Sequence, residues 1–409
     1  MRVIVLLFIS SFLFIPASSQ QQKFFYTRGT EIISPDGQPF LIRGTNLGNW
    51  LVPEGYMFKL QSTNSPRLIN QAFSELLGPA EARNFWQKFL DNYITAADIH
   101  YLKSVGMNSI RVPFNYRLFA NEDYMGGHDK DRGFIYFDRM ISWCKKEQLY
   151  IILDMHCAPG GQTGDNIDDG YGYPFLFDSE ADQEQTVSIW TRIAKKYSNE
   201  PTVLGYDLLN EPIAHYFDTA HFNHLLEPVY KKLVKAIRQV DKNHIIFLGG
   251  AQWDSNFKPF GPPFDSRLVY TFHKYWTPAT KAAVQDYINF RERYQVPIYV
   301  GETGENRDSW IDSFRVVCEQ NRIGWHFWPY KKMDNTRGIV SFDEPAYYDS
   351  VILYAESPRK SFAEIRAARP KDMERIKKSF EELIKNIQFA HCKPNNGYIR
   401  ALGLRGGSL

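Results

Sequence analysis

The chain has 409 residues, of which 44% are hydrophobic and 15% aromatic, and its formal net charge is only +2. This composition is typical of a globular protein with a large core and excludes a disordered chain. Because 48 basic residues are balanced by 46 acidic ones, bulk charge gives no reason to expect nucleic acid or an anionic membrane as a partner. We expect a monomer with no obligatory protein partner.

The first residues have the features of an export signal. Arg2 precedes an apolar run that ends in the small residues 17–19, a pattern typical of signal-peptidase cleavage. We interpret residues 1–19 as a signal peptide and residues 20–409 as one mature domain, secreted to the extracellular space or the periplasm. An uncleaved anchor is the alternative, but the run over 3–16 is shorter than the about 20 residues of a spanning helix.

The body of the chain predicts strands that alternate with helices. A hairpin around the turn Pro35-Asp36-Gly37 comes first. Short apolar runs typical of strands then recur near residues 41, 108, 149, 202, 244, 268, 297 and 323, with helical patterns between them, among them 94–106, 137–148, 184–199 and 225–240. This α/β alternation predicts a single (β/α)₈ barrel, rather than a doubly wound sheet with a glycine-rich phosphate turn.

Three segments depart from the regular repeat. The connections over 45–93 and 155–183 are long, which predicts deep cleft walls on the functional side of the barrel. Beyond residue 346 the pattern is helical, above all over 373–391, and we expect a helical extension of the same domain. The barrel core should span about residues 25–360.

Polar residues recur at the ends of the predicted strands, where a barrel carries its active site. Glu211 and Glu302 are separated by about three βα units of roughly 30 residues each, which places them on strands four and seven, facing one another. Two such carboxyl groups can flank a glycosidic bond, one as acid/base and the other as nucleophile. The further candidates are Asn46, Glu54, Arg111, His156, Asn210, His273, Tyr275 and Trp328.

The neighbours of each carboxyl predict its role. Glu302 is expected to face Arg111 and Tyr275, which both stabilise a carboxylate, so it should stay ionised and act as the nucleophile. Glu211 has no obvious cation beside it and can keep its proton, as a general acid must. Asn210 is then placed to bond the 2-hydroxyl of a sugar.

Other side chains are expected to support the pair. His156 and His273 would bond sugar hydroxyls or hold the carboxylates, whereas Glu305 should cap a helix or form an ion pair. Aromatic side chains crowd the same side and suit the apolar faces of a pyranose, with core packing as the alternative for each. They are Trp50, Tyr56, Phe58, Tyr116, Tyr171, Tyr173, Phe175, Trp253, Trp276 and Trp328.

Metal sites are weakly indicated. The four cysteines are far apart and form no C-x-x-C pair, so zinc is not expected, while one disulfide stays open. Asp165, Asp168 and Asp169 have the composition of a calcium loop without EF-hand spacing, and a solvated acidic loop is the simpler interpretation. Asp154 is expected to orient His156. We expect no metal and no cofactor.

The joint set of motifs resembles glycoside hydrolase family 5, a family of retaining (β/α)₈ hydrolases that includes cellulases. The resemblance covers roughly residues 25–360 and lies in the segments IRVPF, LDMH, LLNEP, FHKYW, VGE and FWPYK. It implies that Glu211 is the acid/base and Glu302 the nucleophile.

Two further segments, GTNLGNWLVPEGY and HCAPGGQTGDNIDDG, are similar to fungal exo-β-1,3-glucanases and bacterial β-glucanases. In those enzymes, residues matching Asn46 and Glu54 shape the glucose subsite. The segment GETGENRD departs from the Trp-containing sequence of the fungal exo-enzymes, so the resemblance does not extend to the β-1,3 linkage or to exo action.

The sequence therefore predicts a secreted, retaining hydrolase of β-glucans or β-glucosides. Cleavage of a mannan, or of a glucosylated lipid such as glucosylceramide or a steryl glucoside, by the same residues is one alternative. A barrel that only binds carbohydrate is another, although a binder need not keep both Glu211 and Glu302. A metal-dependent hydrolase is a third alternative, which activity in the presence of EDTA would exclude.

Overall fold

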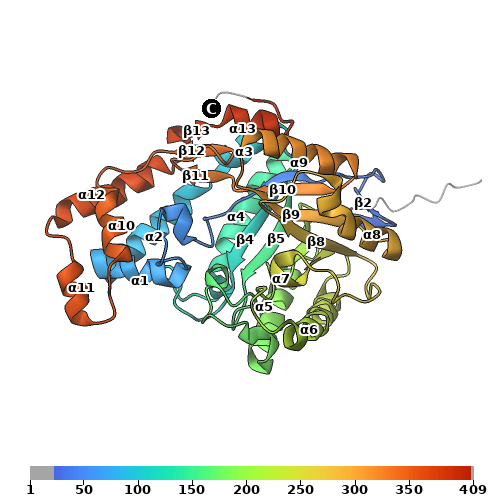
Figure 1. Ribbon diagram of the computed structural model, residues 1–409, viewed down its shortest axis with the longest axis horizontal. Helices are drawn as coiled ribbons and strands as arrows, with labels where there is room; N and C mark the ends of the chain where they lie inside the picture. Colours follow the sequence, from blue (N-terminus) through green and yellow to red (C-terminus); the bar gives the residue numbers. More distant parts are fainter. Residues whose placement is uncertain (1–22, 407–409) are drawn as a thin grey trace, which may run out of the picture.

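The computed structural model describes residues 23–406, and its centre is a closed barrel of eight parallel strands (Figure 1). The strands follow one another around the barrel in chain order, and β10 closes it by pairing with both β9 and β3. They are β3 (Arg43–Asn46), β4 (Ser109–Asn115), β5 (Tyr150–Cys157), β6 (Val203–Asp207), β7 (Ile245–Gly249), β8 (Leu268–Lys274), β9 (Ile298–Gly304) and β10 (Gly324–Trp328). The predicted (β/α)₈ barrel is confirmed.

Six helices connect successive strands, and local sequence signals set their ends. A capping box of Thr95 and Asp98 begins α3, and Gly106 ends it in a left-handed conformation with a φ of 107°. The helices are α3 (Ala96–Val105), α4 (Arg132–Glu147), α5 (Glu180–Tyr197), α6 (Thr219–Val240), α8 (Gln285–Tyr294) and α9 (Asp308–Gln320). The alternation fails once, because β7 is followed only by the four-residue α7 (Ala251–Asp254).

The N-terminal hairpin closes the floor of the barrel. Its ladder joins β1 (Tyr26–Arg28) to β2 (Glu31–Ile33), so the predicted pairing around Pro35-Asp36-Gly37 is only partly right. That turn exists, since the Gly37 N–H donates to the Ser34 carbonyl at 2.9 Å, but a single bridge at Pro39 follows it. Proline has no N–H to extend a ladder.

The hairpin and the inner faces of the strands share one apolar cluster. From the hairpin side come Phe25 and Ile32, and from the strands come Ile152, Leu204, Ile245, Phe247, Val269 and Tyr299. These side chains fill the lower barrel, so polar groups inside the barrel are displaced towards the carboxyl ends of the strands.

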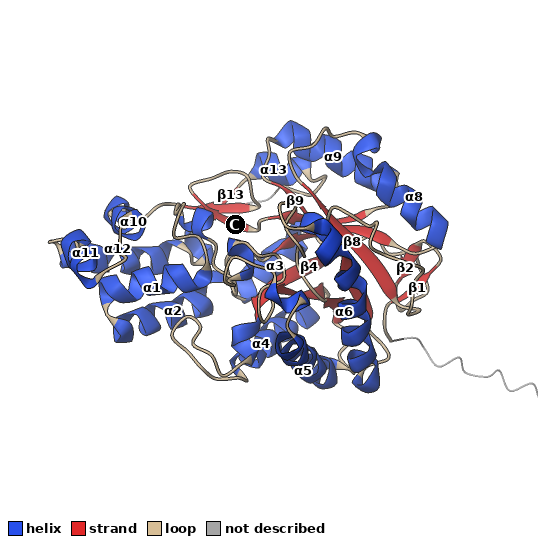
Figure 2. Cartoon of the chain, turned by 60° about the horizontal axis from the view of Figure 1, so that its bottom comes forward, coloured by secondary structure: helices blue, strands red, loops and turns tan. Residues whose placement is uncertain are grey.

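Five helices form a lobe on one side of the barrel, visible in both views (Figures 1 and 2). Phe380 of α12 packs edge-on against Phe73 of α1 and Phe85 of α2, with ring centroids 4.8 and 5.0 Å apart. The predicted C-terminal helical extension is therefore one part of this lobe, and the other part comes from the 45–93 connection. It comprises α1 (Pro66–Leu77), α2 (Pro79–Tyr93), α10 (Tyr348–Glu356), α11 (Phe362–Ala368) and α12 (Met373–Asn386).

The end of the chain returns to the barrel through a small sheet that the sequence did not predict. In it, β12 (Val340–Phe342) pairs in parallel with β11 (Lys331–Met333) and antiparallel with β13 (Lys393–Pro394). The last helix, α13 (Asn396–Ala401), packs against α9. The C-terminal segment thus contacts the helices of the barrel.

Within residues 23–406, no helix combines the length and the apolar character needed to cross a membrane. The expected signal peptide, 1–19, lies outside the described residues. All four cysteines are buried as free thiols, so none of them forms the disulfide that the sequence left open.

Candidate active site

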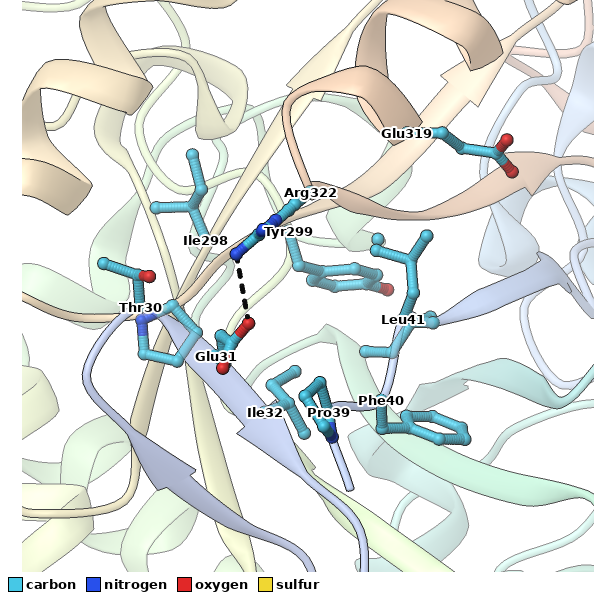
Figure 3. Close-up of a pocket in the computed structure, with 13 residues that line it drawn as sticks. Thr30, Glu31, Ile32, Pro39, Phe40, Leu41, Ile298, Tyr299, Glu319 and Arg322 are labelled. Carbon is cyan, nitrogen blue, oxygen red and sulfur yellow. Dashed lines mark hydrogen bonds and ion pairs between the residues drawn. The ribbon is translucent and has the colours of Figure 1, made fainter. Parts of the chain in front are cut away.

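Two hollows lie at opposite ends of the barrel. The smaller, of about 360 Å³, sits beside the hairpin at the amino ends of β9 and β10 (Figure 3). Its two carboxylates are both engaged in ion pairs, Glu31 with Arg322 at 3.4 Å and Glu319 with Arg43 at 3.0 Å. Because its remaining lining is mainly apolar, this hollow brings no pair of reactive groups together.

The larger hollow, of about 860 Å³, opens at the carboxyl ends of the strands and holds most of the predicted site. Its lining includes seven of the ten predicted residues, namely Glu54, His156, Glu211, His273, Tyr275, Glu302 and Trp328. The other three, Asn46, Arg111 and Asn210, are buried beneath this cleft. The predicted residues thus form a cleft wall and a supporting layer below it.

Arg111 of β4 is the centre of the supporting layer and is fully buried. Its guanidinium lies 2.6 Å from Glu302 Oε1, 2.8 Å from Asp207 Oδ2 and 3.1 Å from Asp154 Oδ1. Burial would lower the pKa of Arg111, but the three carboxylates raise it well above its usual value. Burial raises the pKa of Asp154 and of Asp207 to about 7 against the opposing effect of Arg111, since one guanidinium cannot neutralise three carboxylates.

Two asparagine side chains are fixed by the same guanidinium. Arg111 donates to Asn46 Oδ1 at 3.1 Å and to Asn210 Oδ1 at 2.9 Å. Asn46 Nδ2 in turn donates to the Gly301 carbonyl at 3.1 Å, so both ends of this amide are engaged below the cleft. Asn46 therefore supports Arg111 and β9 instead of lining the expected glucose subsite, whereas Asn210 Nδ2 lies 3.4 Å from His156 Nε2.

Glu302 lies on β9 with each carboxylate oxygen held by a different donor. Arg111 contacts Oε1 at 2.6 Å, and the Tyr275 hydroxyl donates to Oε2 at 3.1 Å. The two partners predicted from the sequence are therefore those in the structure. This arrangement holds the carboxylate in one orientation at the cleft floor.

Glu211 follows β6 and faces Glu302 across the barrel mouth. One oxygen of each carboxyl and a nitrogen of His273 all lie within 4.8 Å of one another. His273 Nδ1 is 2.9 Å from Glu211 Oε1. Burial raises the pKa of Glu211 to about 7, although His156 and Arg111 act in the opposite direction. Near neutral pH this carboxyl can therefore hold a proton.

His156 of β5 is oriented from below, as predicted. Its Nδ1 lies 2.8 Å from Asp154 Oδ2, and its ring stacks parallel to that of Trp328 with centroids 5.8 Å apart. Burial lowers the pKa of His156 to about 4. It is therefore a neutral group that presents a polar ring edge to the cleft beside the flat face of Trp328.

One end of the cleft is closed by contacts between three loops. Trp328 Nε1 donates to the Tyr56 hydroxyl at 2.5 Å, and Lys332 lies over the Tyr56 ring at 4.7 Å. Lys332 Nζ also pairs with Glu305 at 2.5 Å, which confirms the ion pair expected for Glu305. Glu54 is buried beside them, and burial together with the charge of Glu302 raises its pKa well above the usual value.

Several aromatic residues expected in the cleft are instead part of the core. Trp50 and Phe58 are fully buried, and Trp50 Nε1 donates to the Leu90 carbonyl at 2.9 Å in α2. Both lie on the connection that leads into the helical lobe, which explains the error. Tyr116 is also buried, and Tyr171, Tyr173 and Phe175 do not line the cleft. Its aromatic lining consists of Tyr56, Trp253, Tyr275, Trp276 and Trp328.

The interpretation of 165–169 as a solvated acidic loop is wrong for its last two aspartates, which are buried. Asp168 accepts the backbone N–H groups of Thr163 at 2.9 Å, Gly164 at 2.6 Å and Gly170 at 2.8 Å. Asp169 forms an ion pair with Arg117. These carboxylates therefore fold the loop after β5 and are already engaged by protein donors.

The sequence analysis did not predict two site residues. Asp207 lies below the cleft in contact with Arg111, and Asp254 contacts His273. Asp254 is fully buried after β7, a strand for which no polar site residue was predicted. The available signal was the glycine pair that ends this strand. A Cβ on Gly249 would lie 2.0 Å from Asp254 Oδ1, so glycine is needed to make room for that carboxyl.

Within residues 23–406, two groups of side chains have the spacing of a metal site. They are Asp154, His156 and Glu302, and Glu211, His273 and Glu302. Both groups depend on Glu302, whose Oε1 already receives the Arg111 guanidinium at 2.6 Å. A fixed positive charge at a ligand atom opposes a divalent cation, so the arrangement favours proton transfer and nucleophilic attack.

A (β/α)₈ barrel with one carboxyl group after β6 and its partner at the carboxyl end of β9 defines the class of barrel glycoside hydrolases. Residues 73–339 match the family Cellulase (glycosyl hydrolase family 5), and the chain belongs to this family of glycoside-cleaving enzymes. Asn46 and Glu54 lie before the matched residues.

The names of similar proteins point to different substrates. A β-xylosidase of Phanerodontia chrysosporium is 31% identical over 297 residues, which cover 72% of this chain and 60% of the relative. Endoglucanase C of Acetivibrio thermocellus is 28% identical over 312 residues, covering 61% of this chain and 88% of the relative. The solved structure of endoglucanase Cel5A from Thermotoga maritima has a TM-score of 0.51 at 20% identity, covering 73% of this chain and 91% of that one.

Proposed function

We propose that the protein is a secreted, retaining glycoside hydrolase that cleaves β-glucosidic bonds in β-glucans or oligosaccharides. The observation that carries the proposal is the short distance between Glu211 and Glu302, with one oxygen of each within 4.8 Å of the other. Retaining enzymes need carboxyl groups about 5 to 5.5 Å apart, whereas inverting enzymes need roughly 6.5 to 9.5 Å to admit a water.

In the first step, Glu302 attacks the anomeric carbon while Glu211 gives its proton to the leaving oxygen, so the C–O bond breaks and a glycosyl-enzyme ester forms. In the second step, Glu211 takes a proton from the attacking water, and Glu302 leaves as a carboxylate. Arg111 and Tyr275 hold the nucleophile at its two oxygens. Arg111 occupies Oδ1 of Asn210, and His156 Nε2 lies 3.4 Å from its Nδ2, which leaves the second hydrogen of this NH₂ group for the sugar 2-hydroxyl.

The shape of the cleft supports a glycone that ends near Trp328. On that side Tyr56, Lys332 and Glu305 join the loops and close the cleft. On the side of Glu211, Trp276 is 77% exposed and Trp253 also lines the cleft. These faces suit a leaving group that is a further sugar, and they also suit the apolar aglycone of a glucosylated lipid.

The reaction is tested by following the first product with proton NMR on a panel of β-1,3-, β-1,4- and mixed-linkage glucans, a mannan, aryl β-glucosides, aryl β-xylosides and a glucosylated lipid. We expect a β-glucoside to be cleaved, with the β-anomer released first. Initial release of the α-anomer would contradict the retaining mechanism, and preference for xyloside or mannan would contradict the substrate class. An N-terminus near Gln20 in exported protein supports secretion.

The pH dependence should report the acid/base. Because the pKa of Glu211 is raised to about 7, the proton needed for the first step is present below that pH and is lost above it. We expect kcat/KM to fall tenfold per pH unit above about 7 for substrates that need a general acid. Glu211→Ala should remove this basic limb, and a limb that persists in Glu211→Ala would assign it to another group.

A further inference from the structure

The turn after β7 has an unusual backbone that points Asp254 inward. Gln252, Trp253 and Asp254 have φ values of 50°, 61° and 54°, a left-handed conformation that is unfavourable for residues other than glycine. Through this turn Trp253 reaches the cleft lining, while the carboxyl of Asp254 is fully buried. Consecutive strained residues persist where they position a functional group.

The imidazole of His273 lies between the carboxyls of Asp254 and Glu211. Its Nδ1 is 2.9 Å from Glu211 Oε1, and its Nε2, a buried atom to which no described group is hydrogen-bonded, lies 3.2 Å from Asp254 Oδ2. The same Asp254 oxygen accepts the backbone N–H of Glu211 at 3.2 Å. Gly301 leaves room for this ring, because a Cβ there would lie 2.8 Å from Nε2.

A neutral imidazole has one N–H, so its tautomer decides where the proton of Glu211 can be. If Nδ1 carries the hydrogen, it donates to Glu211 Oε1, and the acid proton must sit on Oε2. If Nε2 carries the hydrogen, Nδ1 accepts the proton of Glu211, which then points at the ring and away from a substrate. The group that faces Nε2 therefore determines which oxygen of Glu211 carries the acid proton.

We propose that Asp254 is a positioning residue for the acid/base, which donates a hydrogen to His273 Nε2, fixes the Nδ1–H tautomer and so keeps the acid proton on Glu211 Oε2. The inference rests on the proposed function of Glu211 as the acid. No bond to substrate is made by Asp254, and its own proton stays in place through both steps.

The surroundings of Asp254 favour its neutral form. Burial raises its pKa well above the usual value, and Asp207 and Glu211 raise it further, while Arg111 opposes them. The nearest other titratable groups are His273, whose pKa burial lowers to about 3, and the phenols of Tyr230 and Tyr287. None of these groups is a cation in contact with Asp254.

The tautomer can be observed directly in the wild-type protein by nitrogen-15 NMR of labelled histidine, with the His273 signals assigned by their loss in His273→Gln. We expect the Nδ1–H tautomer at neutral pH, and a shift towards the Nε2–H tautomer in Asp254→Ala. An Nε2–H tautomer in the wild type would overturn the proposal. This measurement needs no turnover, so it is independent of the substrate class.

Kinetics separate this role from a merely structural one. For phenyl β-glucoside, whose leaving group needs a proton, Asp254→Ala should lower kcat/KM by roughly 10- to 100-fold, a part of what a general acid contributes. For 2,4-dinitrophenyl β-glucoside, which leaves unprotonated, the loss should stay within about threefold. Asp254→Asn should recover only part of the difference, because an NH₂ group that donates to Nε2 cannot accept the Glu211 N–H, which Asp254 Oδ2 accepts at 3.2 Å.

Tyr287→Phe is the matched control, because it removes a 2.7 Å hydrogen bond to the Ser255 carbonyl beside the same turn. Tyr287→Phe should change kcat/KM by the same factor for both substrates. Equal losses on both substrates in Asp254→Ala would overturn the positioning role. Wild-type protein that hydrolyses neither glucoside would instead contradict the proposed function.

Discussion

Glu302→Ala is expected to lower turnover by on the order of 10⁵-fold, because it removes the group that forms the covalent intermediate. The fold should survive this change. Glu302 lies at the carboxyl end of β9, and Arg111 keeps its contacts to Asp207 at 2.8 Å and to Asp154 at 3.1 Å. Circular dichroism and thermal unfolding compare the folded state with the wild type, and aryl glucoside hydrolysis measures the loss.

Azide added to the variants assigns the two roles separately. In Glu302→Ala a small anion can occupy the place of the carboxylate and attack C1 directly, which should give an α-glucosyl azide from an activated β-glucoside. In Glu211→Ala azide should attack the glycosyl-enzyme and give the β-glucosyl azide. The opposite pattern of products would exchange the roles of the two residues. If Glu302→Ala hydrolyses the substrate as fast as the wild type does, Glu302 is not the nucleophile.

The short distance between the two carboxyls follows from topology that the sequence pattern reveals. Glu211 follows β6 and Glu302 lies at the carboxyl end of the parallel strand β9, and a closed barrel brings the carboxyl ends of all its strands to one mouth. The same reasoning places Arg111, His156 and Tyr275 near them. Periodicity and strand ends are local features, so a single sequence contains this information.

What the sequence could not predict depends on how irregular segments fold. Trp50 lies only four residues after β3, yet it packs against α2, because the chain turns into the lobe there. Asp254 enters the site through a left-handed turn that its residue types do not favour. Lys332 reaches Glu305 from β11, which pairs with β12, and β12 pairs in turn with β13 from the C-terminal segment. Each of these contacts is set by tertiary structure.

The carboxylates around Arg111 lower the stability of the fold but position the catalytic groups. Asp154, Asp207 and Glu302 are brought into a buried layer around one cation, an arrangement that costs desolvation and is seldom optimal for stability. In return, the layer fixes Glu302 directly, and through Asp154 it orients His156 at 2.8 Å. The buried charges are therefore best understood as the support of the cleft floor.

Arg111→Met should accordingly abolish activity and lower the free energy of unfolding by about 3 to 5 kcal/mol at neutral pH, since three buried carboxyls lose their cation. The pKa of Asp154 and of Asp207 is already raised by burial to about 7, and removal of Arg111 raises each further. A raised pKa in the folded state gives stability that is present below the unfolded value and is lost as pH rises through the folded one.

Urea unfolding should therefore show a larger deficit for Arg111→Met at pH 8 than at pH 5, where the carboxyls can be protonated. Arg111→Lys is the matched control because it keeps the positive charge. It should recover part of the stability, yet little activity, since one ammonium group cannot reach Glu302, Asp207 and both asparagines as the guanidinium fork does. Equal stability of Arg111→Met and the wild type at pH 8 would show that the buried carboxyls are neutral without their cation, and that Arg111 acts on the nucleophile alone.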